Sequence, residues 1–265
     1  MKKFEEKQKK LAEKLSALPR LAIAFSGGYD SSFLAKFAEK ILGPKKILLI
    51  HVDSPFCPSR DKKAVAKFAE LNKIPILLLR ANPLLDSKIS SNTPKRCYHC
   101  KTKIMRLVIS EGRKMGFANF ADGTNLDDIS EHRPGFRATE ELRILHPLLE
   151  AQIRKNDMIQ IAKKLKFDLS FSPSSSCLAT RIPTGTRIDA KSLKKADMAE
   201  NILCDFSIPS PRVRIIGKNA SIEVEPEYFD VILRNRKRIL NKFEDIGFSK
   251  IFLDIRGYRK KAETH

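Results

Sequence analysis

The sequence predicts an α/β fold in which a parallel sheet is sandwiched by helices, with a smaller α+β domain at the C-terminal end. Short apolar runs alternate with segments of helical periodicity in the first half of the chain, and polar residues follow the ends of several runs. The pattern changes after a stretch rich in Pro and Ser near residue 180. Strand, helix and strand in rotation are typical of a parallel sheet covered on both faces.

Four apolar runs are expected to form the strands of the parallel sheet. They are residues 21–25, 47–52, 74–79 and 117–121. Segments with helical spacing of apolar residues separate them, including residues 62–71 and 101–115. Residues 1–7 carry alternating charges without an apolar core behind them, so they predict an amphipathic helix rather than a signal peptide.

Two loops mark the change to the second domain, at residues 171–177 and 181–186. Beyond them the pattern predicts one helix, two hairpin strands, a second helix and a last strand, at residues 190–203, 213–217, 221–225, 227–243 and 251–255. We therefore expect one domain over residues 1–180 and a small α+β domain over residues 181–265.

The composition is that of a globular protein, with 42% hydrophobic and 31% charged residues in 265. No apolar stretch approaches the roughly 20 residues that span a bilayer, so a cytoplasmic location is expected. The formal charge of +20 can be interpreted in two ways. It could attract nucleic acid or a polyanionic substrate, or it could come from basic residues spread over solvated helix faces. Lysine pairs occur along the whole chain and tryptophan is absent, which favours the second reading and leaves a nucleic-acid partner open.

A glycine loop follows the first predicted strand directly. It comprises Ser26, Gly27, Gly28, Tyr29, Asp30, Ser31 and Ser32, and a helical pattern follows it. Glycines let the backbone approach an anion closely, and a helix N-terminus points positive partial charge at it. An ordinary strand-to-helix turn with capping serines is the alternative. No Walker-type lysine follows, and the loop resembles instead the pyrophosphate loop of ATP pyrophosphatases, which implies ATP as a substrate.

This resemblance assigns roles within the loop. Pyrophosphate is expected to lie on Ser26, Gly27, Gly28, Asp30, Ser31 and Ser32. Asp30 is expected near a Mg²⁺ ion that neutralises the leaving group.

Polar residues also end the second and fourth predicted strands. Asp53 and Ser54 follow one strand, and Asp122, Gly123, Thr124, Asn125 and Asp128 follow the other. Ligands of parallel sheets bind at the carboxyl ends of the strands, so these residues should share one crevice with the glycine loop. Asp53, Ser54, Gly123, Thr124 and Asn125 are therefore expected to contact the nucleotide, although plain turns also use these residue types.

The five cysteines are an odd number in a chain without a predicted export signal, so a disulfide framework is not expected. Cys97 and Cys100 form a C-x-x-C pair just before the predicted helix at residues 101–115, and Cys177 lies in the Ser-rich loop. The spacing leaves open an iron–sulfur site, zinc with a foreign ligand, a redox pair and two structural thiols. Cys57 and Cys204 match no motif and are expected to be structural.

A set of motifs in fixed order resembles the LarE family of ATP-dependent sulfur transferases. After the glycine loop come Cys97-Tyr98-His99-Cys100-Lys101, Asp122-Gly123-Thr124-Asn125, Arg133-Pro134-Gly135, Ser175-Ser176-Cys177-Leu178-Ala179-Thr180-Arg181-Ile182-Pro183 and Arg212-Val213-Arg214. The resemblance extends over residues 5–257. It implies an adenine nucleotide alpha hydrolase-like fold and a homo-oligomer. The implied reaction converts a pyridinium-3,5-biscarboxylic acid mononucleotide to its thiocarboxylic form in nickel-pincer cofactor synthesis, with release of AMP and pyrophosphate.

The resemblance also implies the residues that carry the chemistry. In one form of the family the cysteine matching Cys177 gives up its own sulfur. In another, cysteines matching Cys97, Cys100 and Cys177 bind a [4Fe–4S] cluster whose open iron carries the donor sulfide, and the three cysteines of this chain favour that form. Arg181, Arg212 and Arg214 are expected to bind the carboxylates and phosphate of the substrate. Glu200 and Glu223 are expected either to hold a second cation, as in the family, or to be exposed charges.

Three other functions remain open. A tRNA thiolase would use the same adenylation step, and the basic charge supports it. A relative of the ATP-dependent amidases would use the glycine loop and leave the three cysteines without a role. A nucleotide-binding regulator would keep the loop and lack the reaction.

Overall fold

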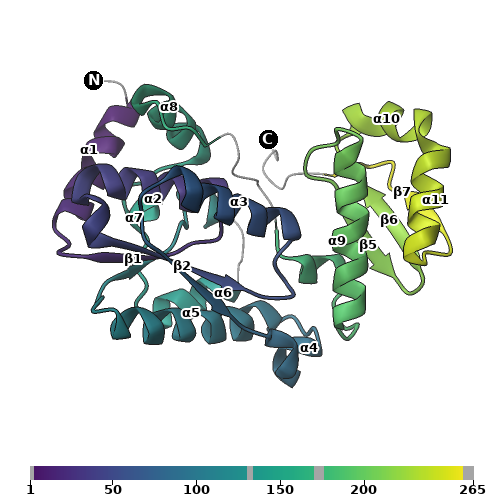
Figure 1. Ribbon diagram of the computed structural model, residues 1–265, viewed down its shortest axis with the longest axis horizontal. Helices are drawn as coiled ribbons and strands as arrows, with labels where there is room; N and C mark the ends of the chain where they lie inside the picture. The colour runs from purple at the N-terminus through teal and green to yellow at the C-terminus, as the bar shows by residue number, and fades with distance from the viewer. Residues whose placement is uncertain (1–2, 130–133, 170–175, 259–265) are drawn as a thin grey trace. The chain divides into compact units, whose positions relative to one another are not determined.

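The computed structural model describes residues 3–129, 134–169 and 176–258 (Figure 1). It divides into two compact units, which we describe separately. The first unit consists of Met1–Ser54, Arg60–Pro83 and Lys95–Ser174, and the second of Pro55–Ser59, Leu84–Pro94 and Ser175–His265. Two short segments from the first half of the sequence therefore belong to the second unit.

A four-stranded sheet forms the centre of the first unit. Its strands are β1 (Leu21–Ala24), β2 (Ile47–Asp53), β3 (Ile76–Arg80) and β4 (Phe120–Ala121). They lie in the order β3-β2-β1-β4, and every pair is parallel. The predicted parallel sheet flanked by helices is confirmed, although β4 is much shorter than the run at residues 117–121.

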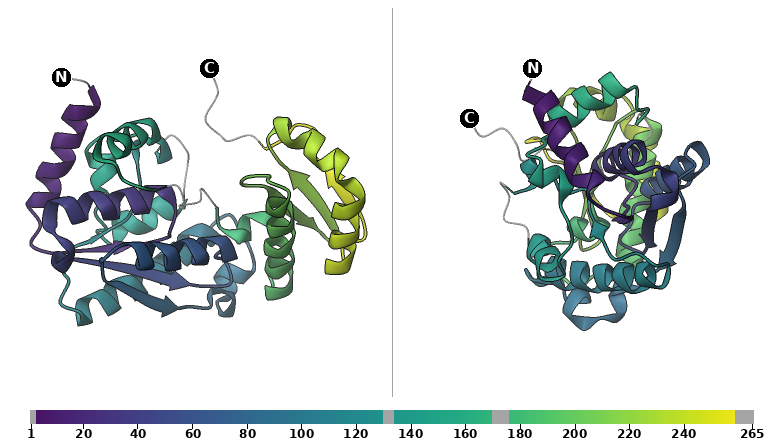
Figure 2. Two further views of the ribbon diagram at one scale, coloured as in Figure 1. Left: turned by 45° about the horizontal axis from the view of Figure 1, so that its top comes forward. Right: turned by 90° about the vertical axis from the view of Figure 1, so that its left-hand side faces the viewer.

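Helices cover both faces of this sheet (Figure 2). The helices and short 3₁₀ turns of the first unit are α1 (Lys3–Ser16), α2 (Tyr29–Leu42), η1 (Pro44–Lys46), α3 (Ser59–Leu71), α5 (Arg96–Lys114), η3 (Leu126–Asp128), α6 (Pro134–Glu141), α7 (Pro147–Glu150) and α8 (Lys155–Leu165). Helix α5 packs on one face, whereas α1, α2, α3, α7 and α8 pack together on the other.

The central strand β2 shows why this unit folds as it does. Its residues alternate between two cores: Ile47 and Leu49 join the core under α1 and α2, while Leu48 and Ile50 join the core under α5. A strand buried on both faces needs a continuous apolar run, and β2 supplies one up to His51. The polar residues begin where the strand leaves the cores, so the sequence itself places them at the carboxyl edge of the sheet.

The second unit contains a three-stranded mixed sheet. Strands β5 (Arg212–Ile216) and β6 (Asn219–Glu223) form an antiparallel hairpin, and β7 (Ile251–Leu253) lies parallel to β6. The remaining elements are η2 (Pro83–Leu85), α4 (Ser87–Ser90), η4 (Leu178–Arg181), α9 (Ala190–Asp205), η5 (Pro226–Tyr228), α10 (Phe229–Arg234) and α11 (Arg236–Ile246).

Two expectations about the helices need correction. The helix expected at residues 227–243 is three elements, because the chain departs from helical geometry at Asn235 (φ −99°, ψ 10°). The Asn235 side chain donates to the backbone oxygen of Val231, a local bond that competes with helix continuation. Helix α5 begins at Arg96 rather than after Cys100, so both cysteines of the C-x-x-C pair lie inside its first turns.

In the described part of the chain, no helix combines the length and the apolar character that crossing a membrane requires.

We expect Phe33→Ala in α2 to destabilise the first unit strongly. The Phe33 side chain has no exposed surface, and its ring lies 5.8 Å from that of Phe37 and 6.3 Å from that of Phe167, measured between centroids. Removing a buried aromatic ring leaves a cavity that costs about 3–5 kcal/mol. Thermal unfolding followed by circular dichroism measures the change. The matched control is Leu71→Ala at the exposed end of α3, which should change stability by about 0.5 kcal/mol or less.

Candidate functional site

The glycine loop joins β1 to α2 and depends on Gly27. Gly27 has a φ of +82°, and a Cβ atom there would lie 2.7 Å from Cγ2 of Val65 and 3.1 Å from the backbone oxygen of Asp61. Both the left-handed backbone and the close packing on α3 therefore require glycine. Gly28 is the N-cap residue of α2 and has no side chain to cap it, so first-turn N–H groups can point toward a ligand.

The serines of the loop have different environments. The hydroxyls of Ser26 and Ser31 lie 3.0 Å apart, Gly28 N donates to Ser26 Oγ (3.2 Å), and Ser31 Oγ donates to Gly28 O (3.0 Å). These bonds hold the loop in shape. Ser32 is fully buried, and its hydroxyl has no hydrogen-bond partner among the described residues.

The turn after β4 lies directly against the start of α2. A Cβ atom on Gly123 would lie 2.8 Å from Ser31 N, which is an approach that only glycine permits. Asn125 is fully buried and donates from Nδ2 to Asp30 Oδ2 at 3.2 Å. A capping box with Asp128 fixes Asn125 in turn. The structure thus brings together the predicted residues of the glycine loop and of the turn after β4.

Asp122 is the electrostatic centre of this turn. Its carboxylate is almost completely buried and accepts from Lys101 Nζ (3.1 Å), His146 Nδ1 (2.9 Å) and Thr124 N (3.1 Å). Burial raises the pKa of Asp122, but the Lys101 charge and the bonds from His146 and Thr124 outweigh it, so the pKa lies far below its ordinary value. Asp122 is therefore ionised, and it ties α5 to the edge of the sheet.

The end of β2 carries a second pair of polar groups. Asp53 forms an ion pair with Lys62 of α3 at 2.6 Å, and both side chains are partly exposed. His51 is buried and bonds through Nδ1 to the backbone oxygen of Phe25 at 2.9 Å. Burial lowers the pKa of His51, which favours the neutral imidazole. Asp53 is the last residue of β2 and Ser54 follows it, at the carboxyl edge that the sequence predicts.

The C-x-x-C pair lies at the start of α5. Cys97 is exposed, Cys100 is half-buried, and Arg96 Nη2 donates to Cys97 Sγ at 3.3 Å. Helix α6 packs on this turn, with Gly135 against Lys101 and the backbone of Cys97.

In the second unit, Cys177 precedes η4 and is exposed. The backbone oxygen of Cys177 accepts from Thr180 N (3.0 Å) and Thr180 Oγ1 (2.8 Å), and Leu178 N donates to Phe56 O (2.9 Å). The loop is therefore held on both sides of the cysteine backbone, while the side chain stays accessible.

The three predicted substrate arginines have different surroundings. Arg181 is 2% exposed and donates to Glu200 from Nε (2.5 Å) and Nη2 (3.1 Å) and to Ser176 and Thr180 from Nη1. Arg214 donates to Glu223 from Nε (2.8 Å) and Nη2 (3.1 Å) and also to the backbone oxygen of Thr180. Both guanidinium groups thus brace the segment after Cys177.

Arg212 differs from the other two because its recorded contact is an aromatic ring rather than a carboxylate. Its Cζ lies 4.1 Å from the centroid of the Tyr258 ring. Burial lowers the pKa of Arg212, and the positive charges of Arg181 and Arg214 add to this effect, whereas Tyr258 and the Glu200 carboxylate oppose it. Among the three, Arg212 is the guanidinium that makes no hydrogen bond to a carboxylate of the described residues.

Glu200 and Glu223 were expected to be cation ligands or exposed charges. In the structure each of them is instead paired with an arginine. Glu200 is 1% exposed and is bonded to Arg181 and to Val213 N, and Glu223 is paired with Arg214.

Within residues 3–129, 134–169 and 176–258, no group of three or more His, Cys, Asp or Glu side chains is arranged to hold a metal ion. Cys97 and Cys100 belong to the first unit and Cys177 to the second, so the proposed three-cysteine ligand set stays a prediction. Arg133 and Ser175 of the family motifs lie outside the described residues.

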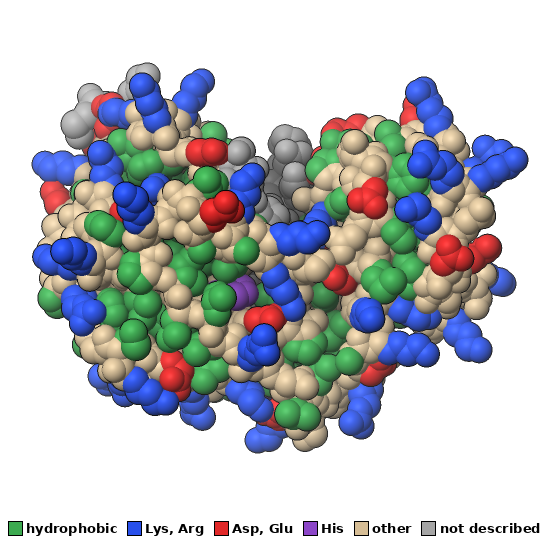
Figure 3. Space-filling view, in the orientation of Figure 1, with side chains coloured by type: hydrophobic (Ala, Val, Ile, Leu, Met, Phe, Trp, Pro, Cys, Tyr) green, Lys and Arg blue, Asp and Glu red, His purple; other side chains and the backbone are tan. Residues whose placement is uncertain are grey.

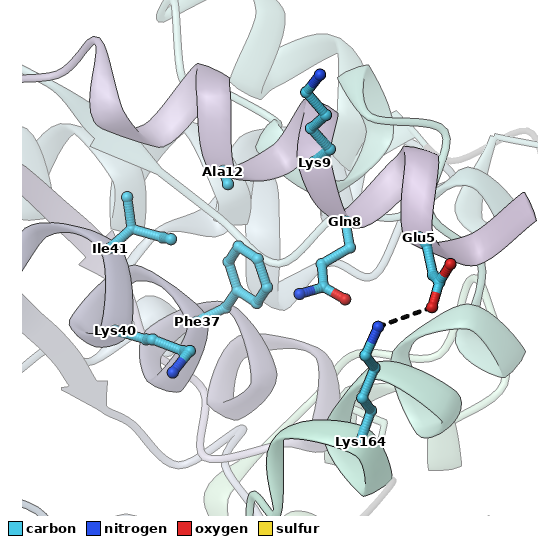
Figure 4. Close-up of a pocket in the computed structure, with 8 residues that line it drawn as sticks. All are labelled: Glu5, Gln8, Lys9, Ala12, Phe37, Lys40, Ile41 and Lys164. Carbon is cyan, nitrogen blue, oxygen red and sulfur yellow. Dashed lines mark hydrogen bonds and ion pairs between the residues drawn. The ribbon is translucent and has the colours of Figure 1, made fainter. Parts of the chain in front are cut away.

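A separate pocket of about 300 Å³ lies between α1, α2 and α8 (Figure 4). It is lined by Glu5, Gln8, Lys9, Ala12, Phe37, Lys40, Ile41 and Lys164. These residues of α2 belong to its C-terminal half, whereas the glycine loop adjoins its first turn. The pocket is therefore not part of the candidate site.

The basic charge is spread over the surface. Lys and Arg side chains lie over the visible face of both units, with acidic side chains among them (Figure 3). On this face, basic and acidic side chains are therefore interspersed.

The fold is thus an α/β unit with an all-parallel sheet and a glycine loop at the carboxyl edge, and a second unit that carries Cys177 and Arg212. No family model matches the chain. The chain is 31% identical over 259 residues to uncharacterized protein MJ0830 of Methanocaldococcus jannaschii, covering 98% of each, and 30% identical over 258 residues to uncharacterized protein slr1717 of Synechocystis, covering 97% of the chain and 96% of that protein.

A third relative has an assigned activity. The chain is 26% identical over 253 residues to pyridinium-3,5-bisthiocarboxylic acid mononucleotide synthase of Lactiplantibacillus plantarum, covering 96% of the chain and 92% of that protein. The chain belongs to the family of these proteins, which is the LarE family that its motifs indicate.

We expect Gly27→Ala to lower the free energy of unfolding by about 2–4 kcal/mol, the sum of left-handed backbone strain and the steric clash with Val65. Gly217→Ala is the matched control, because Gly217 has a φ of +60° but no atom within 4 Å of the added methyl. This control should lower the free energy of unfolding by only about 1 kcal/mol, which is the contribution of backbone strain. Thermal unfolding of both variants measures the difference, and equal losses would contradict close packing at Gly27.

We expect Asp122→Asn to destabilise the protein by about 2–4 kcal/mol at pH 7, because it leaves Lys101 and His146 beside an uncharged group. The folded pKa of Asp122 is depressed, so its stabilisation is full above the unfolded pKa and declines as the pH falls below about 4. The difference in the free energy of unfolding between Asp122→Asn and the wild type should therefore become smaller only at acidic pH. Glu13→Gln, in the exposed pair with Lys9, is the control and should cost about 1 kcal/mol or less.

Proposed function

We propose that this protein is an ATP-dependent sulfur transferase that converts a carboxylate of pyridinium-3,5-biscarboxylic acid mononucleotide to a thiocarboxylate. The packing of the glycine loop and the Gly123 turn around the first turn of α2 carries the proposal, because it holds a helix start without a side-chain cap, and Asp30 within it, at the edge of the sheet. The synthase name of the relative in Lactiplantibacillus plantarum supports the same reaction class.

ATP binding is the first step. The N–H groups of the glycine loop receive the β- and γ-phosphates, while Asp30, held by Asn125, contacts the Mg²⁺ that accompanies them. The ends of β2 and β4, with Asp53, Ser54, Gly123 and Thr124, contact the nucleoside. A substrate carboxylate oxygen attacks the α-phosphorus, and pyrophosphate leaves from the loop. The product of this step is an acyl adenylate, which a sulfur nucleophile attacks far more readily than a carboxylate.

Arg212 binds an oxyanion of the pyridinium mononucleotide in this scheme. Its guanidinium has no carboxylate partner among the described residues, and its planar N–H groups suit bidentate binding to phosphate or carboxylate. Arg181 and Arg214 contribute indirectly, since they brace the segment that presents Cys177.

Two sulfur sources fit the residues. In the sacrificial route the Cys177 thiolate attacks the acyl carbon and AMP leaves. Loss of the Cys177 α-proton and cleavage of its Cβ–Sγ bond then leave a thiocarboxylate and a dehydroalanine. In the cluster route, Cys97, Cys100 and Cys177 supply three thiolates, the ligand set that suits a [4Fe–4S] cluster. The cluster supplies a sulfide donor, so that Cys177 is retained. The exposed Cys97 at a helix N-terminus fits the ligand role, and the three-cysteine set favours the cluster route.

The proposal is tested by incubating anaerobically purified protein with ATP, Mg²⁺ and pyridinium-3,5-biscarboxylic acid mononucleotide. We expect pyrophosphate, AMP and a thiolated product, with an unchanged mass of the peptide that carries Cys177. Loss of about 34 Da from that peptide marks the sacrificial route, which consumes the thiolate once. Cys177→Ser should abolish thiolation, and Cys204→Ser, which alters a half-buried cysteine outside the motifs, should not. Absence of both pyrophosphate and thiolated product refutes the proposed function.

A further inference from the structure

The segment that follows β7 returns along β6 and places Tyr258 against Arg212. Asp254 N donates to Ile222 O at 2.9 Å, and Tyr258 N donates to Val224 O at 2.7 Å. Arg212 is paired in register with Glu223, which lies between these two acceptors in sequence. The two backbone bonds thus fix Tyr258 beside the first residue of β5.

A glycine turn makes this return possible. Gly257 has a φ of +68°, and a Cβ atom there would lie 2.9 Å from Val224 O and 3.0 Å from Cδ of Pro226. A larger residue would displace the segment from the end of β6 and carry Tyr258 with it. The backbone around Gly257, rather than contacts of the ring, therefore determines where Tyr258 lies.

The ring meets a guanidinium with an unusual charge environment. Arg181 and Arg214 are each held by a carboxylate through two hydrogen bonds, and both add positive charge near Arg212. The face of Tyr258, 4.1 Å from Arg212 Cζ, offsets part of this repulsion through a cation–π interaction. A guanidinium that stacks on an aromatic ring uses its face, and its N–H donors lie in its own plane. A carboxylate partner would instead occupy those donors.

We propose that Tyr258 is a positioning residue that holds the plane of Arg212 so that its N–H edge receives an oxyanion, the phosphate monoester of the nucleotide substrate. The identity of the anion rests on the proposed function, whereas the stacking of Tyr258 on Arg212 does not. Tyr258 touches no reacting group in this role. Its effect passes entirely through Arg212.

The test compares Tyr258→Phe, which keeps the ring face, with Tyr258→Leu, which keeps apolar bulk and loses the ring. Isothermal titration calorimetry with inorganic phosphate, and separately with nicotinic acid mononucleotide, measures affinity. The binding component that Arg212→Gln removes is assigned to this site, because the glycine loop also accepts phosphate. We expect Tyr258→Phe to bind within about twofold of the wild type and Tyr258→Leu to bind about five- to thirty-fold more weakly, the range of a partly desolvated cation–π contact.

A double variant separates positioning from a general structural effect. Tyr258→Leu should have no further effect in the Arg212→Gln background, and its melting temperature should stay close to that of Tyr258→Phe. The proposal is overturned if Tyr258→Phe loses as much affinity as Tyr258→Leu, if Tyr258→Leu binds like the wild type, or if the wild type has no Arg212-dependent binding. If binding depends on Tyr258 and Arg212 as expected but no thiolated product forms, the proposed function fails and the positioning role stands.

Discussion

The candidate site depends on two close approaches of backbone to backbone at the N-terminal end of α2. Gly27 passes over α3, and Gly123 lies against Ser31, at distances that leave no room for a methyl group. Both contacts are steric requirements, and together they hold the first turn of one helix at the edge of the sheet. The buried Asn125 and Asp122 then attach to this arrangement through specific hydrogen bonds. Polar side chains in the site are therefore oriented by a rigid backbone scaffold.

The local sequence was sufficient to predict the elements that are determined by helical periodicity and by apolar runs. The strands around Leu21, Ile47 and Ile76 lie within two residues of their expected starts, because each is a continuous apolar run. Periodicity alone could not show that α5 begins at Arg96, since Cys97 and Cys100 carry no helical signal of their own. Nor could it show the break at Asn235, which depends on one side-chain bond.

The polar pairs between residues far apart in the chain could not be predicted from the sequence, for a different reason. His146 is 24 residues from Asp122, and Glu200 is 19 residues from Arg181, so nothing in local spacing connects them. Arg181, Arg212 and Arg214 all lie in the family motifs, and the sequence assigned all three the same role. Only the structure separates the two that are neutralised by carboxylates from Arg212, which stacks on Tyr258. A buried charge needs a partner, but the sequence does not say which residue supplies it.

The second unit is assembled from pieces of chain that are far apart in sequence. Asn92, fully buried, donates from Nδ2 to the backbone oxygens of Pro183 (2.8 Å) and Thr186 (2.9 Å), and its own oxygen accepts from Gly185 N (3.0 Å). Phe56 supplies the acceptor for Leu178. A fragment starting at residue 175 would lack both, which would leave Leu178 N and Gly185 N without these acceptors and the Pro183 and Thr186 oxygens without this donor. The C-terminal region is thus not a transferable module, and recombination that swapped it between relatives would have to carry the two upstream segments along.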